Sequence, residues 1–216
     1  MEKKAVLFDL DGTLINSLPD ISRCMNEALA LYNLPQHDEA AYAYRVGNGA
    51  RVLTERAVGE HQELADDVLR AYSERYAVHC FDKSYIYEGI LDLFSGLIKK
   101  GLKLVVLSNK DDPDVTTVMR HYFPDIPFTI MRGRLPGVPL KPDPTAAINI
   151  AKEMNLMPHE FWYLGDTPVD CKCCLQAGMN FIGVTYGFRT RDEIASAGAT
   201  ILVDTPREAL EIIIAG

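Results

Sequence analysis

The chain has 216 residues, of which 48% are hydrophobic and 24% are charged, and its formal net charge is -8 at pH 7. This composition is typical of a globular protein with room for one full hydrophobic core and a small insert. The negative charge argues against nucleic acid or an anionic membrane surface as the main partner. An anionic substrate would therefore need local help from a metal ion or from placed basic residues.

The amino-terminal segment carries Lys3 and Lys4 but does not resemble a signal peptide, because Asp9 interrupts the apolar run after four residues. No uninterrupted apolar segment approaches membrane-spanning length. The cysteines are Cys24, Cys80, Cys171, Cys173 and Cys174. Their odd number favours free thiols in a reducing cytoplasm. We expect a cytoplasmic protein that is a monomer or a weak homodimer.

Cys171 and Cys174 have the Cys-x-x-Cys spacing that is found in zinc and redox sites. No second pair of ligands at a suitable spacing accompanies them. The sequence therefore favours structural thiols on a helix.

The first predicted element is a short buried strand over residues 5–8, which ends in Asp9-Leu10-Asp11-Gly12-Thr13. In open α/β sheets, ligands bind at the carboxyl ends of the strands. Alternation along an extended backbone points Asp9 and Asp11 to the same side, and the Thr13 hydroxyl can hold a phosphate oxygen. An ordinary Asp-Gly turn would explain this stretch equally well on its own. The choice depends on partners further along the chain.

Residues 15–83 are predicted to form a helical cap domain, inserted into an α/β core made of residues 1–14 and 84–216. Apolar spacing predicts helices over 20–32, 40–44, 49–58 and 63–78, with no strand among them. An insertion directly after the Asp9 loop lies over the active edge of the sheet. It is placed to act as a lid.

After Gly89 helices and strands alternate, which predicts a doubly wound parallel α/β sheet. The predicted strands cover 102–107, 128–131, 161–164, 180–184 and 200–203. The predicted helices cover 90–100, 112–123, 144–154, 170–177, 191–197 and 206–214.

Polar side chains follow three of these strands or precede the next helix. Ser108 and Asn109 offer a hydroxyl and an amide for phosphoryl oxygens, and Lys141 could neutralise phosphate charge. Asp166 and Asp170 lie one helical turn apart. Gathered at one edge, the carboxylates of Asp9, Asp11 and Asp166 would suit Mg2+, which would let an aspartate nucleophile approach an anionic phosphate.

In this order the motifs resemble those of the haloacid dehalogenase superfamily phosphatases, over nearly the whole chain. The matching residues are Asp9-Leu10-Asp11-Gly12-Thr13, Ser108, Lys141 and Gly165-Asp166-x-x-x-Asp170. Each motif alone is weak, but the combination is specific. The resemblance implies a Rossmann-like core with an inserted small helical cap.

The resemblance also implies a role for each matching residue. Asp9 would be the nucleophile that forms a phosphoaspartate and also a metal ligand. Asp11 would be the general acid and base, with its backbone carbonyl on the metal. Asp166 would bind the metal directly, while Asp170 would support the metal site and orient Lys141. The residues expected to hold the phosphoryl group are Thr13, Ser108, Asn109 and Lys141.

Within the helical insert, the stretch from Arg45 through Gly47, Asn48 and Gly49 resembles one typical of the phosphoglycolate phosphatase group. A Gly-Asn-Gly turn that opens a helix can aim backbone N–H groups at an anion, and Arg45 would add a positive fork for a carboxylate. The alternative is a plain glycine turn with solvated arginines. Residues 183–189 also resemble that group, whereas residues 131–137 are more basic than expected of it.

The predicted function is Mg2+-dependent hydrolysis of a small phosphate monoester through a phosphoaspartate, with 2-phosphoglycolate as the best candidate. A sugar phosphomutase related to β-phosphoglucomutase, or a pyrophosphate or nucleotide phosphatase, would share every core motif. Two alternatives from other classes are a receiver-like phospho-acceptor domain and an inactive regulatory binding protein.

Overall fold

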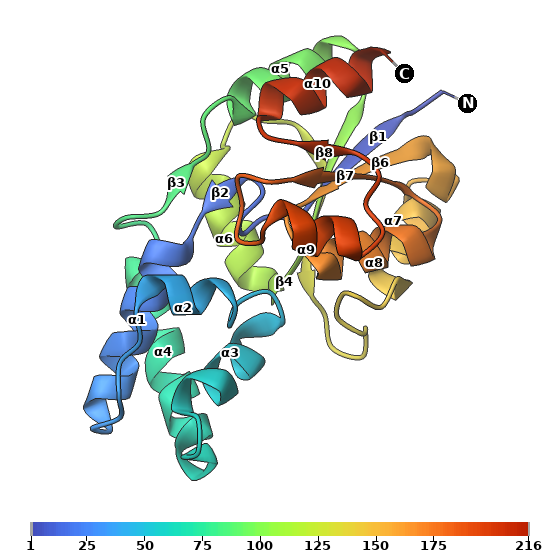
Figure 1. Cartoon of the computed structure of the whole chain (residues 1–216). Helices are drawn as coiled ribbons and strands as arrows, with labels where there is room; N and C mark the ends of the chain where they lie inside the picture. Colours follow the sequence, from blue (N-terminus) through green and yellow to red (C-terminus); the bar gives the residue numbers. More distant parts are fainter. Residues whose placement is uncertain (1, 216) are drawn as a thin grey trace.

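The structure, a computed structural model, describes residues 2–215 and is built on one six-stranded parallel sheet (Figure 1). Its strands are β1 (Ala5–Phe8), β4 (Lys103–Asp111), β5 (Phe128–Arg134), β6 (Phe161–Gly165), β7 (Asn180–Val184) and β8 (Leu202–Val203). Their spatial order is β5-β4-β1-β6-β7-β8, so the chain moves outward from β1 in both directions. The predicted doubly wound α/β fold class is confirmed.

Helices cover both faces of the sheet. One face buries side chains of α5 (Ile90–Lys99), α6 (Asp112–Tyr122) and α10 (Pro206–Ala215). The other buries α7 (Thr145–Glu153), α8 (Pro168–Ala177) and α9 (Arg191–Ser196), and the short 3-10 turn η2 (Pro158–Glu160) leads into β6. Val6 and Phe8 of β1 join the first cluster, and Ala5 and Leu7 join the second. This two-sided burial is why the strand reads as an uninterrupted apolar run.

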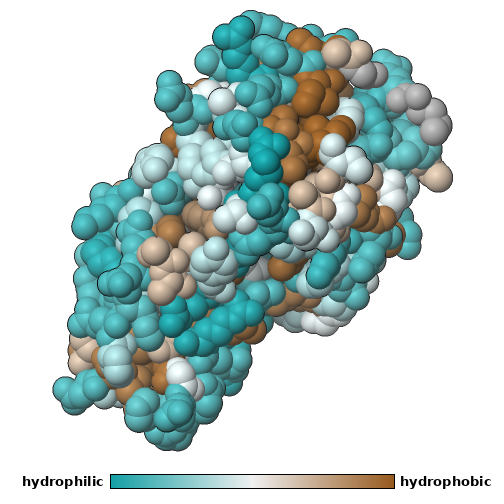
Figure 2. All heavy atoms as spheres, in the orientation of Figure 1, coloured by the Kyte–Doolittle hydropathy of each residue, from teal (hydrophilic) through white to brown (hydrophobic). Residues whose placement is uncertain are grey.

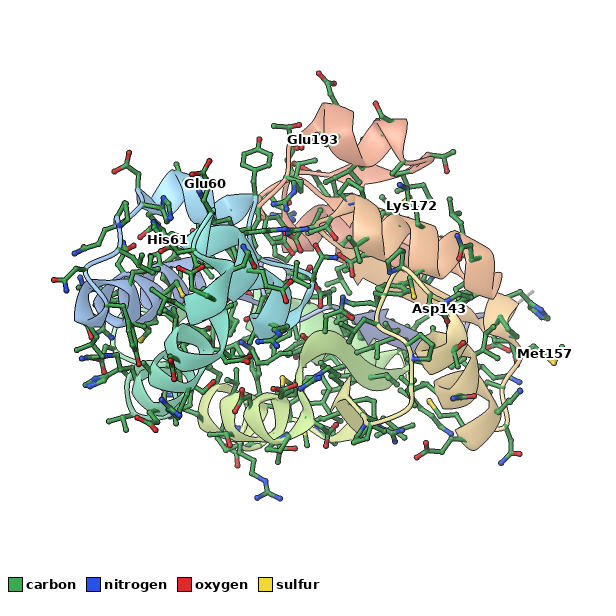
Figure 3. The ribbon with its side chains drawn as sticks, turned by 90° about the horizontal axis from the view of Figure 1, so that it is seen from below. Glu60, His61, Asp143, Met157, Lys172 and Glu193 are labelled. Atoms are coloured by element: carbon green, nitrogen blue, oxygen red, sulfur yellow. The ribbon has the colours of Figure 1, made fainter. Side chains whose placement is uncertain are left out.

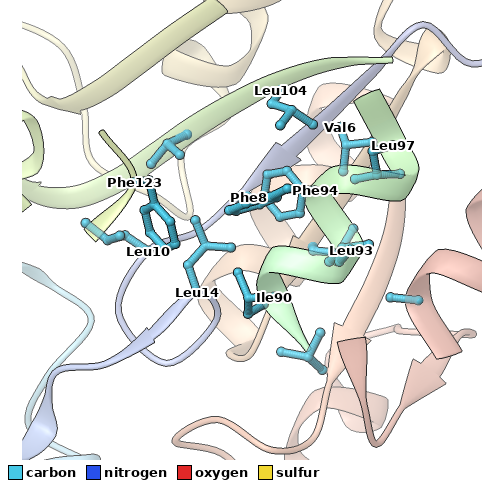
Figure 4. Close-up of a cluster of buried hydrophobic side chains, with 14 of the residues drawn as sticks. Val6, Phe8, Leu10, Leu14, Ile90, Leu93, Phe94, Leu97, Leu104 and Phe123 are labelled. Atoms are coloured by element: carbon cyan, nitrogen blue, oxygen red, sulfur yellow. The ribbon is translucent and has the colours of Figure 1, made fainter. Parts of the chain in front are cut away.

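Aromatic packing fixes the end of β1. The rings of Phe8 and Phe94 meet edge to face with their centroids 5.5 Å apart (Figure 4). Phe94 makes a second edge-to-face contact with Phe123, at 5.3 Å. On the outside, the face shown in Figure 2 is mostly hydrophilic. Because Phe8 immediately precedes Asp9, this packing holds the start of the Asp9 loop in place.

A separate layer contains α1 (Leu18–Leu31), α2 (Glu39–Ala43), α3 (Gly49–Val58), the 3-10 turn η1 (Gln62–Leu64) and α4 (Ala65–His79). These helices enclose their own hydrophobic cluster, which includes Met25, Tyr42, Leu53 and Tyr72. Figure 1 shows the layer in blue to teal at one end of the sheet. The helices lie within one or two residues of their predicted positions.

The prediction that residues 15–83 contain no strand is wrong. Strand β2 (Ile15–Asn16) pairs antiparallel with β3 (Tyr85–Ile86), and this two-stranded ribbon joins the helical layer to the larger sheet. Two-residue strands are too short to show alternation, so the sequence carries no signal for them. Strand β4 also runs to Asp111, beyond the predicted end at Leu107, with a register irregularity between those two residues.

A buried carboxylate ties the two strands of this junction together. Asp20, in the first turn of α1, accepts hydrogen bonds from the backbone N–H groups of Lys83 (2.9 Å) and Ser84 (2.7 Å). The Ser84 hydroxyl (2.8 Å) and the Arg23 guanidinium (3.0 Å) also donate to it. Burial works to raise the pKa of Asp20, but these hydrogen bonds outweigh it and hold the pKa below its usual value.

We expect Asp20→Asn to lower the free energy of unfolding by about 1.5–3 kcal/mol, the size of hydrogen bonds to a charged group. Urea denaturation at pH 7 measures this loss. Because the pKa of Asp20 is lowered in the folded state, its contribution is present above the unfolded pKa of about 3.9 and is lost as the pH falls. The two proteins should therefore converge in stability in acid.

The matched control is Asp82→Asn, because Asp82 also accepts from Arg23 (2.8 Å) but is exposed. Exposed ion pairs contribute about 0–1 kcal/mol. Equal losses from the two substitutions would contradict the special role of Asp20.

Candidate active site

The ammonium group of Lys141 lies at the centre of the candidate site. Its Nζ donates to Asp9 Oδ1 (2.7 Å), to Asp170 Oδ1 (2.7 Å) and to the backbone carbonyl of Leu107 (3.0 Å). All three N–H donors of the ammonium are therefore used within the protein. These partners come from the residue after β1, from within β4 and from the first turn of α8. The convergence follows from parallel strands, whose carboxyl ends share one edge.

The first turn of α8 orients Asp170. Thr167 caps this helix, accepts the Asp170 backbone N–H at 3.3 Å and donates its hydroxyl to Asp170 Oδ2 at 2.5 Å. The Tyr163 hydroxyl donates to Asp170 Oδ1 at 3.3 Å. Pro168 at the start of the helix has no N–H to satisfy. These contacts therefore fix the Asp170 side chain with its carboxylate facing Lys141.

Three buried carboxylates gather around this lysine. Oxygen atoms of Asp9, Asp166 and Asp170 all lie within 4.8 Å of one another. Against the single ammonium of Lys141, these three carboxylates leave two negative charges in excess. Burial, and then the charge of Asp170, raise the pKa of Asp9, while Lys141 opposes the rise. A divalent cation with oxygen ligands would balance this charge, so the donor set fits Mg2+.

Asp166 is placed by the loops on either side of it. The Thr13 hydroxyl donates to Asp166 Oδ1 at 2.9 Å, and the Phe188 backbone N–H donates to Oδ2 at 2.8 Å. Burial, followed by Asp170, raises the pKa of Asp166 to about 7, and these two hydrogen bonds oppose the rise. The approach is so close that a Cβ on Gly12 or Gly187 would lie 2.3 Å from an atom of Asp166.

Thr13 therefore differs from its expected role. It was predicted to hold the phosphoryl group, but it is fully buried beneath the site and its hydroxyl is used by Asp166. It does not line the cavity described below. The sequence could not separate these roles, because a hydroxyl near a carboxylate and a hydroxyl near a phosphate look the same in a motif.

Ser108 and Asn109 lie within β4 and are themselves buried. Ser108 lines the cavity, and its Oγ accepts the Lys110 backbone N–H at 3.1 Å. The Asn109 amide makes two hydrogen bonds to the backbone of Lys141. Its Oδ1 accepts from the Lys141 N–H at 2.9 Å, and its Nδ2 donates to the Lys141 carbonyl at 3.0 Å. Nδ2 also donates to the Gly47 carbonyl at 2.8 Å. Asn109 thus positions Lys141 and contacts the helical layer, rather than offering a free amide to phosphate.

Asp11 turns away from the carboxylate cluster. Its Oδ2 pairs with Lys110 Nζ at 3.2 Å, while its Oδ1 is buried and has no hydrogen-bond partner in the described part of the chain. The predicted alternation of Asp9 and Asp11 does not bring their carboxylates into one set of metal ligands. Asp11 therefore stands outside the carboxylate cluster, with one oxygen paired to Lys110 and the other without a partner among the described residues.

A cavity of about 280 Å³ lies between the sheet edge and the helical layer. Its lining residues from the sheet side include Asp9, Asp11, Ser108, Asn109, Lys110, Lys141 and Asp170. Those from the helical layer include Val46, Gly47, Gly49, Leu53, Tyr72 and Tyr76. Figure 3 shows the helical layer, marked by Glu60 and His61, beside the helices that carry Lys172 and Glu193. The cavity is thus built jointly by both parts.

The structure does not bring Arg45 or Asn48 into this cavity. The guanidinium of Arg45 donates back to the Ala41 carbonyl at 3.0 Å and to the Arg56 carbonyl at 3.4 Å. These hydrogen bonds connect the end of α2 to α3, so the Arg45 guanidinium is not directed at a substrate carboxylate. Of the predicted Gly-Asn-Gly turn, only Gly47 and Gly49 face the cavity.

Lys110 is the cavity residue that sequence reasoning missed. It extends from β4 to the helical layer, where its Nζ lies 3.1 Å from the Tyr76 hydroxyl. Burial works to lower the pKa of Lys110, but the charge of Asp11 outweighs it and the pKa is raised. Its place in the chain could have found this residue, because Lys110 directly follows Ser108 and Asn109, which line the same cavity.

With this geometry in view, the chain is a hydrolase of the phosphate-handling α/β type. It belongs to the family of haloacid dehalogenase-like hydrolases, whose model matches residues 6–184. The resemblance seen in the sequence is therefore confirmed.

Several of its relatives are similar over nearly their full length. The chain is 31% identical over 219 residues to the phosphoglycolate phosphatase of Mannheimia succiniciproducens, covering 97% of this chain and 98% of that protein. A crystal structure of a predicted phosphoglycolate phosphatase from Haemophilus somnus has a TM-score of 0.91 at 30% identity, with 98% of both chains covered. The relatives are phosphoric monoester hydrolases by name, and the prediction of an enzyme of this class is confirmed.

A more distant structure shares the fold. CbbY from Rhodobacter sphaeroides, in complex with xylulose-(1,5)bisphosphate, has a TM-score of 0.78 at 24% identity and covers 95% of this chain and 96% of that one.

Between residues 2 and 215, no helix has the length and apolar character that a membrane crossing requires.

Proposed function

We propose that this protein is a Mg2+-dependent phosphatase that hydrolyses 2-phosphoglycolate through a phosphoaspartate intermediate. The observation that carries the proposal is the buried cluster of Asp9, Asp166 and Asp170 around Lys141, at the base of a cavity of about 280 Å³. The names of the relatives support the substrate. The free and buried state of all five cysteines supports a reducing compartment such as the cytoplasm.

Asp9 is the nucleophile in this proposal. Lys141 holds its Oδ1, which leaves Oδ2 free to attack phosphorus. The phosphorus–oxygen bond to glycolate then breaks, and the leaving oxygen takes a proton from Asp11. In the second half, water attacks the phosphoaspartate and gives a proton to Asp11, so that phosphate leaves and Asp9 is restored.

Mg2+, held by Asp9, Asp166 and the Asp11 backbone carbonyl with Asp170 in support, would neutralise phosphate charge. Ser108 and Lys141 line the cavity where the phosphoryl group would lie. Asn109 and Thr13 act indirectly, through the Lys141 backbone and Asp166 respectively.

We also propose that residues 15–83 form a cap over a core of residues 1–14 and 84–216. The pairing of β2 with β3 joins the two parts through only two residue pairs, which suits a hinge. The Tyr76 hydroxyl and the Gly47 carbonyl of the helical layer contact Lys110 and Asn109 of the core. A cap held closed by these contacts would exclude water from the reacting atoms.

Phosphate release tests the function directly. We expect the enzyme with Mg2+ to release phosphate from 2-phosphoglycolate with a higher kcat/KM than from pyrophosphate, a nucleotide monophosphate, glucose 1-phosphate or a pentose bisphosphate. Chelation of the metal should abolish release. Conversion of a sugar phosphate without release of phosphate would indicate a mutase instead, and inertness toward every ester would favour a regulatory protein.

Metal binding should also be visible without any substrate. If Mg2+ binds the folded protein only, about 100 times its Kd stabilises by about 2.7 kcal/mol, which corresponds to a rise in Tm of about 5–10 °C. Asp166→Asn should remove most of this rise, whereas Asp192→Asn, an exposed position of α9, should keep it. A rise of the same size in Asp166→Asn would contradict the assigned metal site.

A further inference from the structure

The cavity contains a second lysine that the proposed reaction does not use. Lys110 comes from β4, its side chain is only 8% exposed, and it lines the cavity beside Asp11. Burial of an ammonium group is costly unless it has partners. The burial of Lys110 in this position therefore suggests that its ammonium group has a function.

Its hydrogen bonds leave capacity for a ligand. Within the described residues, the Lys110 ammonium has two polar partners, Asp11 Oδ2 at 3.2 Å and the Tyr76 hydroxyl at 3.1 Å. An ammonium has three N–H donors, so one remains. Lys141, by contrast, spends all three on Asp9, Asp170 and a carbonyl.

Apart from Lys141, whose three donors are used within the protein, Lys110 is the one cation among the described residues that lines this cavity, because Arg45 is turned back onto α2 and α3. The remaining charged lining residues are the carboxylates of Asp9, Asp11, Asp111, Asp114 and Asp170. A second anionic group on the substrate would be repelled everywhere except beside Lys110.

The position of Lys110 beside Asp11 indicates which part of the substrate would contact Lys110. In the proposed reaction Asp11 protonates the leaving oxygen, and the Lys110 ammonium is 3.2 Å from Asp11. The group attached close to that oxygen therefore lies beside Lys110. A cavity of about 280 Å³ is below the usual range of about 300–1,000 Å³ for small-molecule sites, so the substrate must be short.

The helical layer completes this subsite. The Tyr76 hydroxyl accepts from Lys110, so its own O–H hydrogen remains available to a carboxylate. Tyr76 stacks on Tyr72, with ring centroids 5.4 Å apart, and both rings line the cavity. The ring stack makes the wall rigid, which favours one short ligand over longer ones.

We propose that Lys110 is a specificity-determining residue that pairs with a carboxylate located one carbon from the ester oxygen of the substrate. The substrate class is then a short phosphate monoester of a 2-hydroxy acid. This inference rests on the proposed phosphatase function and deepens it.

The test compares two esters that differ only in the proposed contact. 2-Phosphoglycolate carries the carboxylate, and 2-hydroxyethyl phosphate has a hydroxymethyl group in its place. We expect the wild-type enzyme to favour 2-phosphoglycolate in kcat/KM, and Lys110→Met to reduce this preference by about 10- to 100-fold. Lys110→Arg, which keeps the charge, should retain part of the preference.

The ratio separates the proposed contact from an indirect effect through Asp11. If Lys110 acted only by positioning Asp11, Lys110→Met would slow both esters equally and the preference would stay, which would overturn the inference. The inference would also be overturned if the wild-type enzyme hydrolysed the two esters, 2-hydroxyethyl phosphate and 2-phosphoglycolate, with equal kcat/KM. This outcome does not depend on whether the variant folds. In that case the phosphatase proposal would stand, whereas failure to release phosphate from any ester with Mg2+ would sink both.

Discussion

Asp9→Asn should reduce kcat for the best substrate by about 10⁴-fold or more, the scale seen when a covalent nucleophile is removed. An amide cannot form the phosphoaspartate, because its oxygen is too weak a nucleophile and it carries no charge. The substitution keeps the shape of the side chain and its ability to accept from Lys141 at Oδ1. Steady-state phosphate release measures the loss.

The folded state should survive this change. With all three carboxylates ionised, the cluster of Asp9, Asp166, Asp170 and Lys141 would carry two negative charges in excess, and Asp9→Asn removes one of them. Thermal unfolding without Mg2+ should therefore give a Tm equal to or higher than that of the wild type. Calorimetry should still detect binding of the unreacted ester.

Asp192→Asn serves as the control, because this exposed position of α9 does not line the cavity and should leave kcat unchanged. Retention of wild-type activity by Asp9→Asn would contradict the assignment of Asp9 as the nucleophile. A collapse of Tm would instead show that Asp9 is needed for the fold.

The sequence was sufficient for the parts of the site that one geometric rule places. Asp9 follows β1, Asp166 follows β6, and parallel neighbouring strands end at one edge, so these residues must approach each other. Lys141 lies in the loop that leads into α7, and Asp170 lies in the first turn of α8, so both are close to the same edge. Local chain direction thus carries the information, and the prediction of an α/β hydrolase succeeds for the same reason.

The rule that parallel strands end at one edge does not predict the direction of side chains in the helical layer. Arg45, just after α2, could turn toward the cavity or back along that helix. Its direction is set by the Ala41 and Arg56 carbonyls, which the packing of α2 on α3 brings close. Lys110 was missed because β4 was expected to stop at Leu107. Once the strand continues through a register irregularity, Ser108 and Lys110 face the cavity together.

The junction of β2 with β3 was missed for another reason. Each strand has two residues, and their pairing depends on Asp20, which holds Lys83 and Ser84 from a position more than 60 residues earlier in the chain. Contacts of this sequence separation leave no periodic trace. They become visible only when the tertiary structure is known.

Lys141→Met should have the second largest effect, a loss of about 10²- to 10³-fold in kcat, the scale for removing one preorganised donor from a reacting oxygen. The variant leaves Asp9 and Asp170 facing each other without the ammonium, so the nucleophile is neither oriented nor held in its charged form. Lys172→Met is the control, since this lysine lies on the outer side of α8 (Figure 3) and should keep full activity.

Stability should fall together with activity in Lys141→Met, but for a separable reason. Removal of one partner from a buried ion pair costs about 3–5 kcal/mol, because the remaining charge is left uncompensated. Adding Asp170→Asn to Lys141→Met removes one of the uncompensated carboxylates, so the double variant should regain part of the free energy of unfolding measured in urea. It should regain no activity, because nothing replaces the ammonium on Asp9. Recovery of kcat in the double variant would mean that Lys141 acts only by neutralising Asp170, and that its contact with Asp9 is incidental to the reaction.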